Sequence, residues 1–371
     1  MPVLIYLYVT LAVALTTLIS GVYQKKQRIP ASMQDYKKYE DSTRKVPWLN
    51  ITIIAGMLGL YSKSLGLAEG LVDRISYVYN FYFRYPIYYS SPEALLEAKT
   101  EPGIIVISML VAKLTDNALW LFFVVTMLSM LINLYVISKL TIDYTAVILI
   151  LMLSMFFLDG IYLVKQMTSI AFANLAFYSY VNGKRIRYLL YSVIACLFHS
   201  TAVILFVLYF VYRFARAKKV YAVIFFLFSF LFIYLGPLLS RVFPSIPFVR
   251  QYLEFDRYGY SLGGGSTAAF IKGIPFYIIS GLSIHKREAL KKELKQADIF
   301  IIACVLYSMC WLFTFNMYWF YRIGWYLMLP ALILIPALYR TIKDQKAHLF
   351  LLFTGLLIMA ALTLRQLYLI L

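Results

Sequence analysis

Acidic residues are scarce in this chain: its 371 residues contain 17 Asp and Glu against 35 Lys and Arg, so the formal net charge is +18. Charged residues of both signs make up only 14% of the sequence, whereas hydrophobic residues make up 62% and the mean hydropathy is +0.77. A soluble domain averages roughly 45–50% apolar residues. The composition therefore excludes an ordinary soluble protein and predicts a single integral membrane domain over residues 1–371.

Sequence motifs of several enzyme classes are also absent. The chain contains no GxxxxGK[ST], GxSxG or HExxH pattern and no metal-spaced set of Cys and His. Its three cysteines lie in apolar segments without a CxxC pair, and we interpret them as core residues: Cys196, Cys304 and Cys310. The basic residues gather in short loops between apolar runs, which is typical of cytoplasmic membrane loops. We therefore expect no metal, no cofactor and no nucleic-acid partner.

Apolar runs of about 17–25 residues, long enough to cross a bilayer, recur along the chain. The loops between them alternate in charge, and the basic ones are assigned to the cytoplasmic side, which leaves both termini outside. The predicted fold is all-α and polytopic, with about ten spanning helices: 2–22, 48–66, 118–138, 144–158, 161–182, 220–238, 266–284, 298–316, 319–340 and 348–370.

Two further apolar pieces, 103–114 and 188–212, are predicted to be re-entrant or interfacial helices. Both flanks of 188–212 are basic, and its 25 residues are too few for two crossings at about 1.5 Å per residue. We expect its turn near His199. Because re-entrant segments need surrounding protein or a water-filled cavity, two of them predict such a cavity. The segments 67–102 and 239–265 are predicted to be non-cytoplasmic loops.

Cationic side chains lie inside five of the apolar spans, near the ends predicted to be non-cytoplasmic: Lys63, Lys165, Lys272, Arg322 and Arg365. Ionisable groups within spans usually face a cavity or a partner rather than lipid. Acidic side chains are too few to serve all of them. The simplest missing partner is an anionic ligand at the outer leaflet, such as a lipid-linked phosphate.

The chemistry of such a ligand selects the candidate site residues. Arg322 stays charged, and its planar fork suits phosphate; Tyr326 lies at i+4 on the same helix face. Lys165 and Gln166 begin another span, although a Lys at a span end also snorkels to the interface. Further candidate contacts, which are alternatively solvated loop charges or span-end cations, are Arg74, Arg84, Arg241, Arg250, Arg257 and Lys272.

Acid–base candidates are fewer. His199 is one of three histidines and lies at the predicted re-entrant turn, although a lone His on an apolar face is more often a packed residue. Glu101 precedes Pro102 and Gly103 at the mouth of the other re-entrant piece. Asp159 and Asp73 are weaker candidates, since each carboxylate more often caps a helix or pairs with a cation.

Four short runs resemble the signature of EpsG-type proteins, which belong to the Wzy-like bacterial polysaccharide polymerases: Glu101-Pro102-Gly103, Lys165-Gln166-Met167-Thr168-Ser169, Cys196-Leu197-Phe198-His199-Ser200-Thr201-Ala202 and Arg322-Ile323-Gly324-Trp325-Tyr326. Two features depart from the family pattern. Lys165 stands where Arg is usual, which keeps the charge but loses bidentate geometry. The segment from Lys63 to Glu69 lacks the Asp that often follows the second span.

The resemblance implies a metal-independent membrane glycosyltransferase of the glycosyltransferase C type. Such an enzyme joins undecaprenyl-pyrophosphate-linked oligosaccharide units into capsular polysaccharide, exopolysaccharide or O-antigen, at the outer face of the bacterial cytoplasmic membrane. The partners it implies are this lipid-linked substrate, membrane lipid, and flippase and chain-length regulator proteins. On this reading His199, Arg322, Lys165 and Glu101 are the catalytic residues. His199 acts as a base on the acceptor hydroxyl or as a phosphate contact.

Two other functions fit the same cations. A flippase for lipid-linked oligosaccharide needs a cationic cavity that opens to both leaflets, whereas these cations lie near the outer ends only. A ligase that transfers finished polymer uses the same pyrophosphate chemistry. A scaffold without catalytic activity gives no reason for five outward-lying cations.

Overall fold

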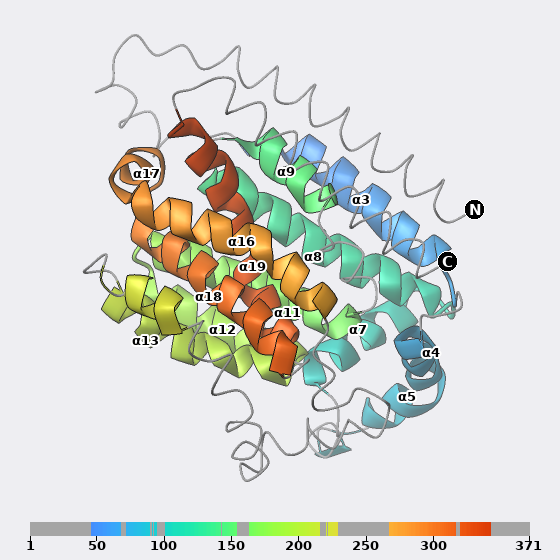
Figure 1. Ribbon diagram of the computed structural model, residues 1–371. Helices are drawn as coiled ribbons and strands as arrows, with labels where there is room; N and C mark the ends of the chain where they lie inside the picture. The colour runs from blue at the N-terminus through green and yellow to red at the C-terminus, as the bar shows by residue number, and fades with distance from the viewer. Residues whose placement is uncertain are drawn as a thin grey trace. The chain divides into compact units, whose positions relative to one another are not determined.

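The computed structural model describes residues 46–67, 72–89, 91, 93–94, 101–141, 143–153, 163–215, 220, 222–228, 267–316 and 320–342. Throughout these residues every regular element is a helix, as Figure 1 shows, so the all-α prediction is confirmed for them. The chain divides into two compact units, one formed by 1–202 with 353–371 and the other by 203–352.

The first unit contains the helices α3 (Trp48–Ser64), α4 (Val72–Tyr79), η1 (Asn80–Arg84), α5 (Tyr85–Tyr88), α7 (Pro102–Ala112), α8 (Leu119–Leu140), α9 (Tyr144–Leu153), α11 (Val164–Val181), α12 (Arg185–Phe198) and the short turn η2 (Ser200–Val203). The second unit contains α13 (Ile204–Ala215), α16 (Thr267–His285), α17 (Arg287–Glu293), α18 (Ala297–Asn316) and α19 (Phe320–Arg340).

Within the described residues, three stretches are long and apolar enough to cross a membrane: Leu119–Leu140, Ala297–Thr314 and Phe320–Arg340. The prediction of about ten spans is not confirmed, and the predicted spans 2–22 and 348–370 lie outside the described residues. Other predicted spans form helices that are too short or not apolar enough to be counted with these three. α3 has 17 residues. α11 carries a row of buried polar residues that lowers its hydropathy: Gln166, Thr168, Ser169 and Asn174.

α8 lies at the centre of the first unit, with α3 along one side (Figure 1). The Trp48 ring stacks on Tyr135 at 5.6 Å, and Gly59 sits against Phe123, so α3 runs antiparallel to α8. α11, in contrast, runs parallel to α8. Ser129 hydrogen-bonds Thr168 at 3.1 Å, and Asn174 donates to Asn133 at 2.8 Å. Hydrogen bonds of this kind hold helices together in a bilayer, where burial of apolar surface supplies little force.

A tight turn at Gly183, where φ is +75°, reverses the chain from α11 into α12. Ser169 Oγ donates to the carbonyl of Ala195 at 2.8 Å, and the Phe172 and Phe198 rings stack at 5.6 Å. The beginning of α11 therefore lies beside the end of α12. The relative directions of α3, α8, α11 and α12 match those predicted from the basic loops. That this end faces outside stays a prediction.

The two ambiguous segments have the predicted helical form. α12 ends at Phe198, η2 follows, and α13 begins at Ile204, so the helix breaks where the turn is expected. Residues 103–114 are covered largely by α7. Of the buried cysteines, Cys304 and Cys310 are core residues as predicted, whereas Cys196 is half-buried.

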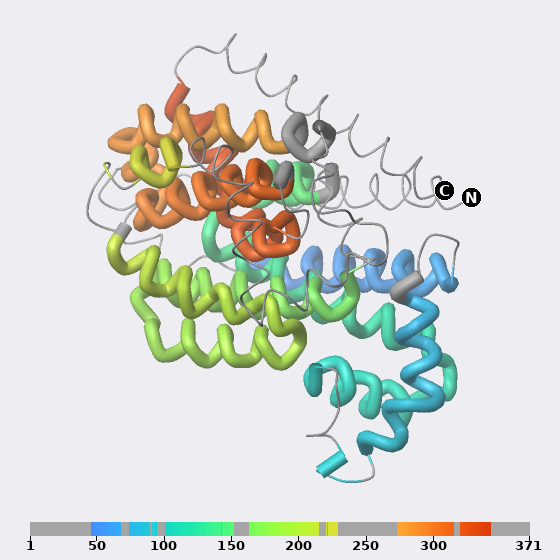
Figure 2. Tube along the Cα trace, turned by 60° about the horizontal axis from the view of Figure 1, so that its bottom comes forward, coloured from blue at the N-terminus to red at the C-terminus, as the bar shows by residue number. Residues whose placement is uncertain are grey.

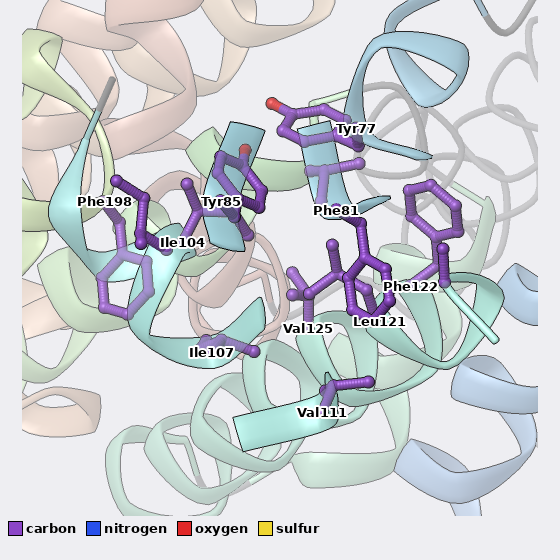
Figure 3. Packing of buried hydrophobic residues seen from close by; sticks show 13 residues of the cluster. Tyr77, Phe81, Tyr85, Ile104, Ile107, Val111, Leu121, Phe122, Val125 and Phe198 are labelled. Carbon is purple, nitrogen blue, oxygen red and sulfur yellow. The ribbon is translucent and has the colours of Figure 1, made fainter. Parts of the chain in front are cut away.

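Residues 72–88, inside the predicted outer loop 67–102, are helical throughout. Figure 2 shows α4, η1 and α5 as one curved segment. One side of it packs on α7, α8 and Phe198 through Tyr77, Phe81 and Tyr85, and Figure 3 shows Phe198 beside Ile104 at the edge of this cluster. The other side leaves aromatic residues exposed: Tyr79, Tyr82 and Phe83. An amphipathic segment of this kind is typical of a membrane interface.

In the second unit, small residues let the long helices approach closely. A Cβ on Gly273 of α16 would lie 2.8 Å from Trp311 of α18, and one on Gly324 of α19 would lie 3.1 Å from Cys310. In the first turn of α18, Asp298 accepts two parallel hydrogen bonds from Arg287 of α17, at 2.5 and 2.8 Å. This bidentate pair fixes α17 against α18.

Candidate active site

An ion pair joins two elements that the sequence separates by 64 residues. Lys165 Nζ, in the first turn of α11, donates to Glu101 Oε2 at 2.6 Å, and Glu101 is the N-cap residue of α7. The side chains are 25% and 19% exposed, so water reaches the pair without surrounding it. The ammonium also lies 5.9 Å from the centre of the Tyr77 ring, within range of a cation–π attraction.

His199 occupies the end of α12, next to this pair. Its Nδ1 lies 2.7 Å from Thr201 Oγ1 and 3.2 Å from the Thr201 backbone nitrogen. The imidazole is near enough to Glu101 to help lower the pKa of that carboxyl. The first unit thus brings Lys165, Glu101 and His199 together from three elements, namely α11, α7 and the α12–η2 turn.

Gly103 explains how α7 comes so close to His199. A Cβ at this position would lie 2.8 Å from the Phe198 ring and 2.9 Å from the Leu197 carbonyl oxygen. No side chain larger than hydrogen fits between the start of α7 and the end of α12. Pro102 pre-sets the first turn of α7, since its missing N–H is one that a helix start leaves unbonded. The Glu101-Pro102-Gly103 run therefore positions the carboxylate.

The pKa of Glu101 reflects two opposing influences. Burial raises it, and the charge and hydrogen bond of Lys165 lower it; the net shift is downwards. Glu101 is accordingly ionised at neutral pH. The three groups have different capacities. The Lys165 ammonium can bind a phosphate oxygen, the Glu101 carboxylate can accept a proton, and the His199 imidazole can donate or accept a hydrogen bond.

Arg74, a predicted ligand contact, is fully buried in α4. It donates from Nη2 to the Ser62 carbonyl at 2.6 Å and stacks at 3.8 Å over the Phe122 ring. Burial lowers its pKa to about 10, so it stays charged at neutral pH. Lys63, at the end of α3, lies 3.5 Å above the Trp120 ring. Both cations therefore have aromatic partners, which connect α3 and α4 to the start of α8.

Arg322 belongs to the second unit, near the beginning of α19. Its Nε donates to Tyr321 Oη at 3.3 Å, and the guanidinium is half-buried. Tyr326, predicted on the same helix face, is buried. That Arg322 meets Lys165 and His199 in a shared pocket stays a prediction.

The remaining predicted contacts fall into three groups. Gln166 is buried in α11, whereas Arg84 is exposed at the end of η1. Lys272 lies within α16, and its side chain is not among those described. The loop arginines Arg241, Arg250 and Arg257, together with Arg365 and Asp159, lie outside the described residues. Over the described parts of the chain, no group of three or more His, Cys, Asp or Glu residues is placed to hold a metal ion.

Two residues in contact with the candidate site, Tyr77 and Thr201, are not among the site residues predicted from the sequence. Tyr77 was one of many tyrosines in the outer segment, and only the α4 fold places its ring beside Lys165. Thr201 appears in the sequence only as part of the run from Cys196 to Ala202, and its contact with His199 depends on the path of η2. The spacing of His and Thr, two residues apart after a helix end, is the signal that indicates such a contact.

The apolar helices and the clustered polar groups at one end of the first unit define a helical membrane protein with a candidate site between helix ends. The sequence matches the EpsG family over residues 72–369, and the chain belongs to that family, a family of Wzy-like polysaccharide polymerases. No curated protein matches the chain, and no solved structure matches it either. The matched region includes all four residues predicted to be catalytic.

Proposed function

We propose that this chain is a polysaccharide polymerase that joins undecaprenyl-pyrophosphate-linked oligosaccharide units at the outer face of the bacterial cytoplasmic membrane. The product is a capsular polysaccharide, an exopolysaccharide or an O-antigen. The observation that carries the proposal is the Lys165–Glu101 pair beside His199, in a chain of a polymerase family. The family supports the polymerase activity, and the Lys165 ammonium supports an anionic carrier such as a lipid diphosphate.

The reaction is a displacement at the anomeric carbon. A hydroxyl oxygen of one unit forms the new glycosidic bond, and the bond from the anomeric carbon to the pyrophosphate oxygen breaks. The electron pair leaves with undecaprenyl pyrophosphate, and the hydroxyl proton passes to a base. Negative charge therefore grows on phosphate oxygens, where fixed cations in a site with little water stabilise it strongly.

Each candidate residue has a role in this step. Lys165 contacts a pyrophosphate oxygen, and Arg322 with one or more loop arginines holds the rest of the diphosphate. Glu101 aims the Lys165 ammonium and places a carboxylate beside it. His199 acts in one of two ways, as the base for the acceptor hydroxyl or as a further hydrogen-bond donor to the leaving group.

The direct test is incubation of the purified protein with a synthetic prenyl-pyrophosphate repeat unit, with product length analysed on a gel. We expect a ladder of polymer in place of the single unit. In cells, deletion should leave single lipid-linked units facing outwards. Units stranded on the inner side would instead indicate a flippase, and long unattached chains would indicate a ligase.

Substitution of the candidates adds a second test. His199→Ala and Arg322→Ala should each abolish polymer in membranes that contain normal amounts of the protein. Arg340→Ala is the matched control, because Arg340 ends the same helix as Arg322 and pairs loosely with Glu293 at 3.9 Å. Full-length polymer from both His199→Ala and Arg322→Ala would end the assignment.

A further inference from the structure

Two donors converge on one nitrogen of His199. The Thr201 backbone nitrogen lies 3.2 Å from Nδ1, and Thr201 Oγ1 lies 2.7 Å from it. A backbone N–H only donates, so Nδ1 must accept and carries no proton. The hydroxyl, which is able to donate or accept, then also donates to the same lone pair. The backbone contact thus sets the direction of both hydrogen bonds.

The local fold produces this arrangement. α12 ends at Phe198, and His199 adopts extended backbone angles, φ −159° and ψ 126°. The chain then turns at once into η2, where the Ala202 N–H donates to the His199 carbonyl at 3.0 Å. This turn carries Thr201 back over the imidazole of His199. The contact is therefore a consequence of the helix break.

A neutral imidazole without a proton on Nδ1 carries it on Nε2. Such a ring donates from Nε2 and has no lone pair there to accept a proton. The serine protease triad shows the opposite polarity, since an acceptor carboxylate holds the Nδ1 proton and leaves Nε2 basic. In this chain a donor occupies the place of that carboxylate.

We infer that His199 serves the proposed polymerase reaction as a hydrogen-bond donor from Nε2 to an oxygen of the departing pyrophosphate, and that Thr201 is the positioning residue that selects this tautomer. The inference rests on the proposed function and decides between the two roles given to His199 there. The proton of the attacking hydroxyl then passes to the Glu101 carboxylate. The bonding electrons of the broken anomeric C–O bond stay on the phosphate oxygen that His199 and Lys165 contact.

The charged groups near His199 agree with a donor role. Glu101 of α7 is one of these groups, and Lys165 of α11 pairs with it. Lys165 already provides a full positive charge for the leaving group. Protonation of His199 on Nδ1 would bring that proton against the Thr201 N–H, so a neutral Nε2–H donor is the form this turn accommodates.

A glutamine at position 199 separates the two roles. In His199→Gln, the side-chain amide nitrogen takes the approximate place of Nε2 and donates, but it accepts no proton. Polymer formed per protein should remain at least tenfold above that of His199→Ala. His199→Asn is the matched control, because its shorter amide corresponds to Nδ1 and should be as inactive as alanine. Equal inactivity of folded His199→Gln and His199→Ala would overturn the inference.

The tautomer itself is measurable in the unmutated protein. Full-length protein labelled with ¹⁵N-histidine should show the His199 ring with a proton on Nε2 and none on Nδ1. The signals of this ring are identified by their absence from the spectrum of His199→Gln. Thr201→Val removes the hydroxyl but keeps the backbone N–H; it should weaken this preference and lower polymerisation about 3- to 10-fold, the effect of one hydrogen bond. Thr201→Ser should restore both. A proton found on Nδ1 of the His199 ring in the unmutated protein rejects the inference, whatever the activities of the variants.

The outcomes also separate this inference from the proposed function. If the unmutated protein makes no polymer from the synthetic repeat unit, the proposed function fails, whatever the tautomer. If it makes polymer while the ¹⁵N spectrum shows a proton on Nδ1, the function stands and the donor role falls.

Discussion

Two ion pairs of similar burial differ in how completely their hydrogen bonds are used. Arg287 and Asp298, in the second unit, are 16% and 19% exposed, and two guanidinium nitrogens meet the two carboxylate oxygens. Lys165 and Glu101, in the first unit, are 25% and 19% exposed and join through one nitrogen and one oxygen. An ammonium has three donors. The Arg287–Asp298 pair therefore resembles a structural clamp, whereas the Lys165–Glu101 pair keeps donors that a ligand could use.

The difference also lies in the neighbours. Arg287 and Asp298 connect α17 to the first turn of α18, and Glu288 adds a further contact to Arg287 at 2.8 Å. Lys165 and Glu101 instead lie beside His199 and the Tyr77 ring, where three elements end. Charge and burial alone therefore do not distinguish the two pairs. The remaining donors of Lys165 and the groups around it do.

Removal of each cation should give the largest contrast. Lys165→Met keeps the apolar stem and removes the charge, and we expect polymer formation to fall more than 100-fold. Arg287→Met should lower polymer only as far as it lowers the amount of protein in the membrane. Polymer per protein, measured in isolated membranes, checks both.

Stability must be separated from activity in that experiment, because Lys165→Met leaves Glu101 without its cation. Breaking one partner of a buried pair costs more than removing both. Lys165→Met with Glu101→Gln should therefore recover protein level without recovering polymer. Recovery of polymer in the double variant would make the pair structural.

Exchanging the two charges sharpens the comparison further. Arg287→Asp with Asp298→Arg rebuilds a clamp of opposite direction, and polymer should stay within about threefold of the unmutated level, since the exchanged side chains can again form a charge-assisted pair. Lys165→Glu with Glu101→Lys also rebuilds a pair, but it moves the cation to α7. We expect a loss of at least tenfold in polymer per protein, because the leaving group then meets a carboxylate. Equal tolerance of both exchanges would contradict a ligand site at Lys165.

A smaller effect should follow from one added methyl group. Gly103→Ala places a Cβ against the Phe198 ring and the Leu197 carbonyl oxygen, so α7 must move away from the end of α12. We expect about a tenfold loss of polymer with little change in protein level, because a shift near 1 Å in a site has effects of this order or larger. Gly56→Ala, in α3, is the control: its Cβ meets nothing within 4 Å. Full activity in Gly103→Ala would show that this close approach does not position Glu101 or His199.

For the described residues, the sequence was sufficient to predict an all-α fold and the break near His199. Hydrophobic periodicity and basic loops depend on local composition, and these features follow from it. It was not sufficient to predict which partners meet. Lys165 and Glu101 are 64 residues apart, and their contact depends on Gly103 admitting the end of α12. Residues 72–88 are predicted as part of an outer loop, but they form α4, η1 and α5, because Tyr77, Phe81 and Tyr85 pack on α7 and α8.

The smallest effect expected is the contribution of the Lys165–Glu101 pair to the pH dependence of stability. Lys165 holds the pKa of Glu101 below its ordinary value, so the pair contributes stability above the ordinary glutamate range and loses it as pH falls through the lowered pKa. Thermal unfolding of the purified protein between pH 7 and pH 3 should show this loss, of the order of 1 kcal/mol for one partly exposed pair. Glu101→Gln should flatten that part of the profile, because an amide does not titrate. His285→Gln, in α16 of the second unit, is a control that leaves the pair intact and should keep the acid dependence. A profile unchanged by Glu101→Gln would mean that the pair does not stabilise the fold, and the 2.6 Å contact would then matter for the ligand alone.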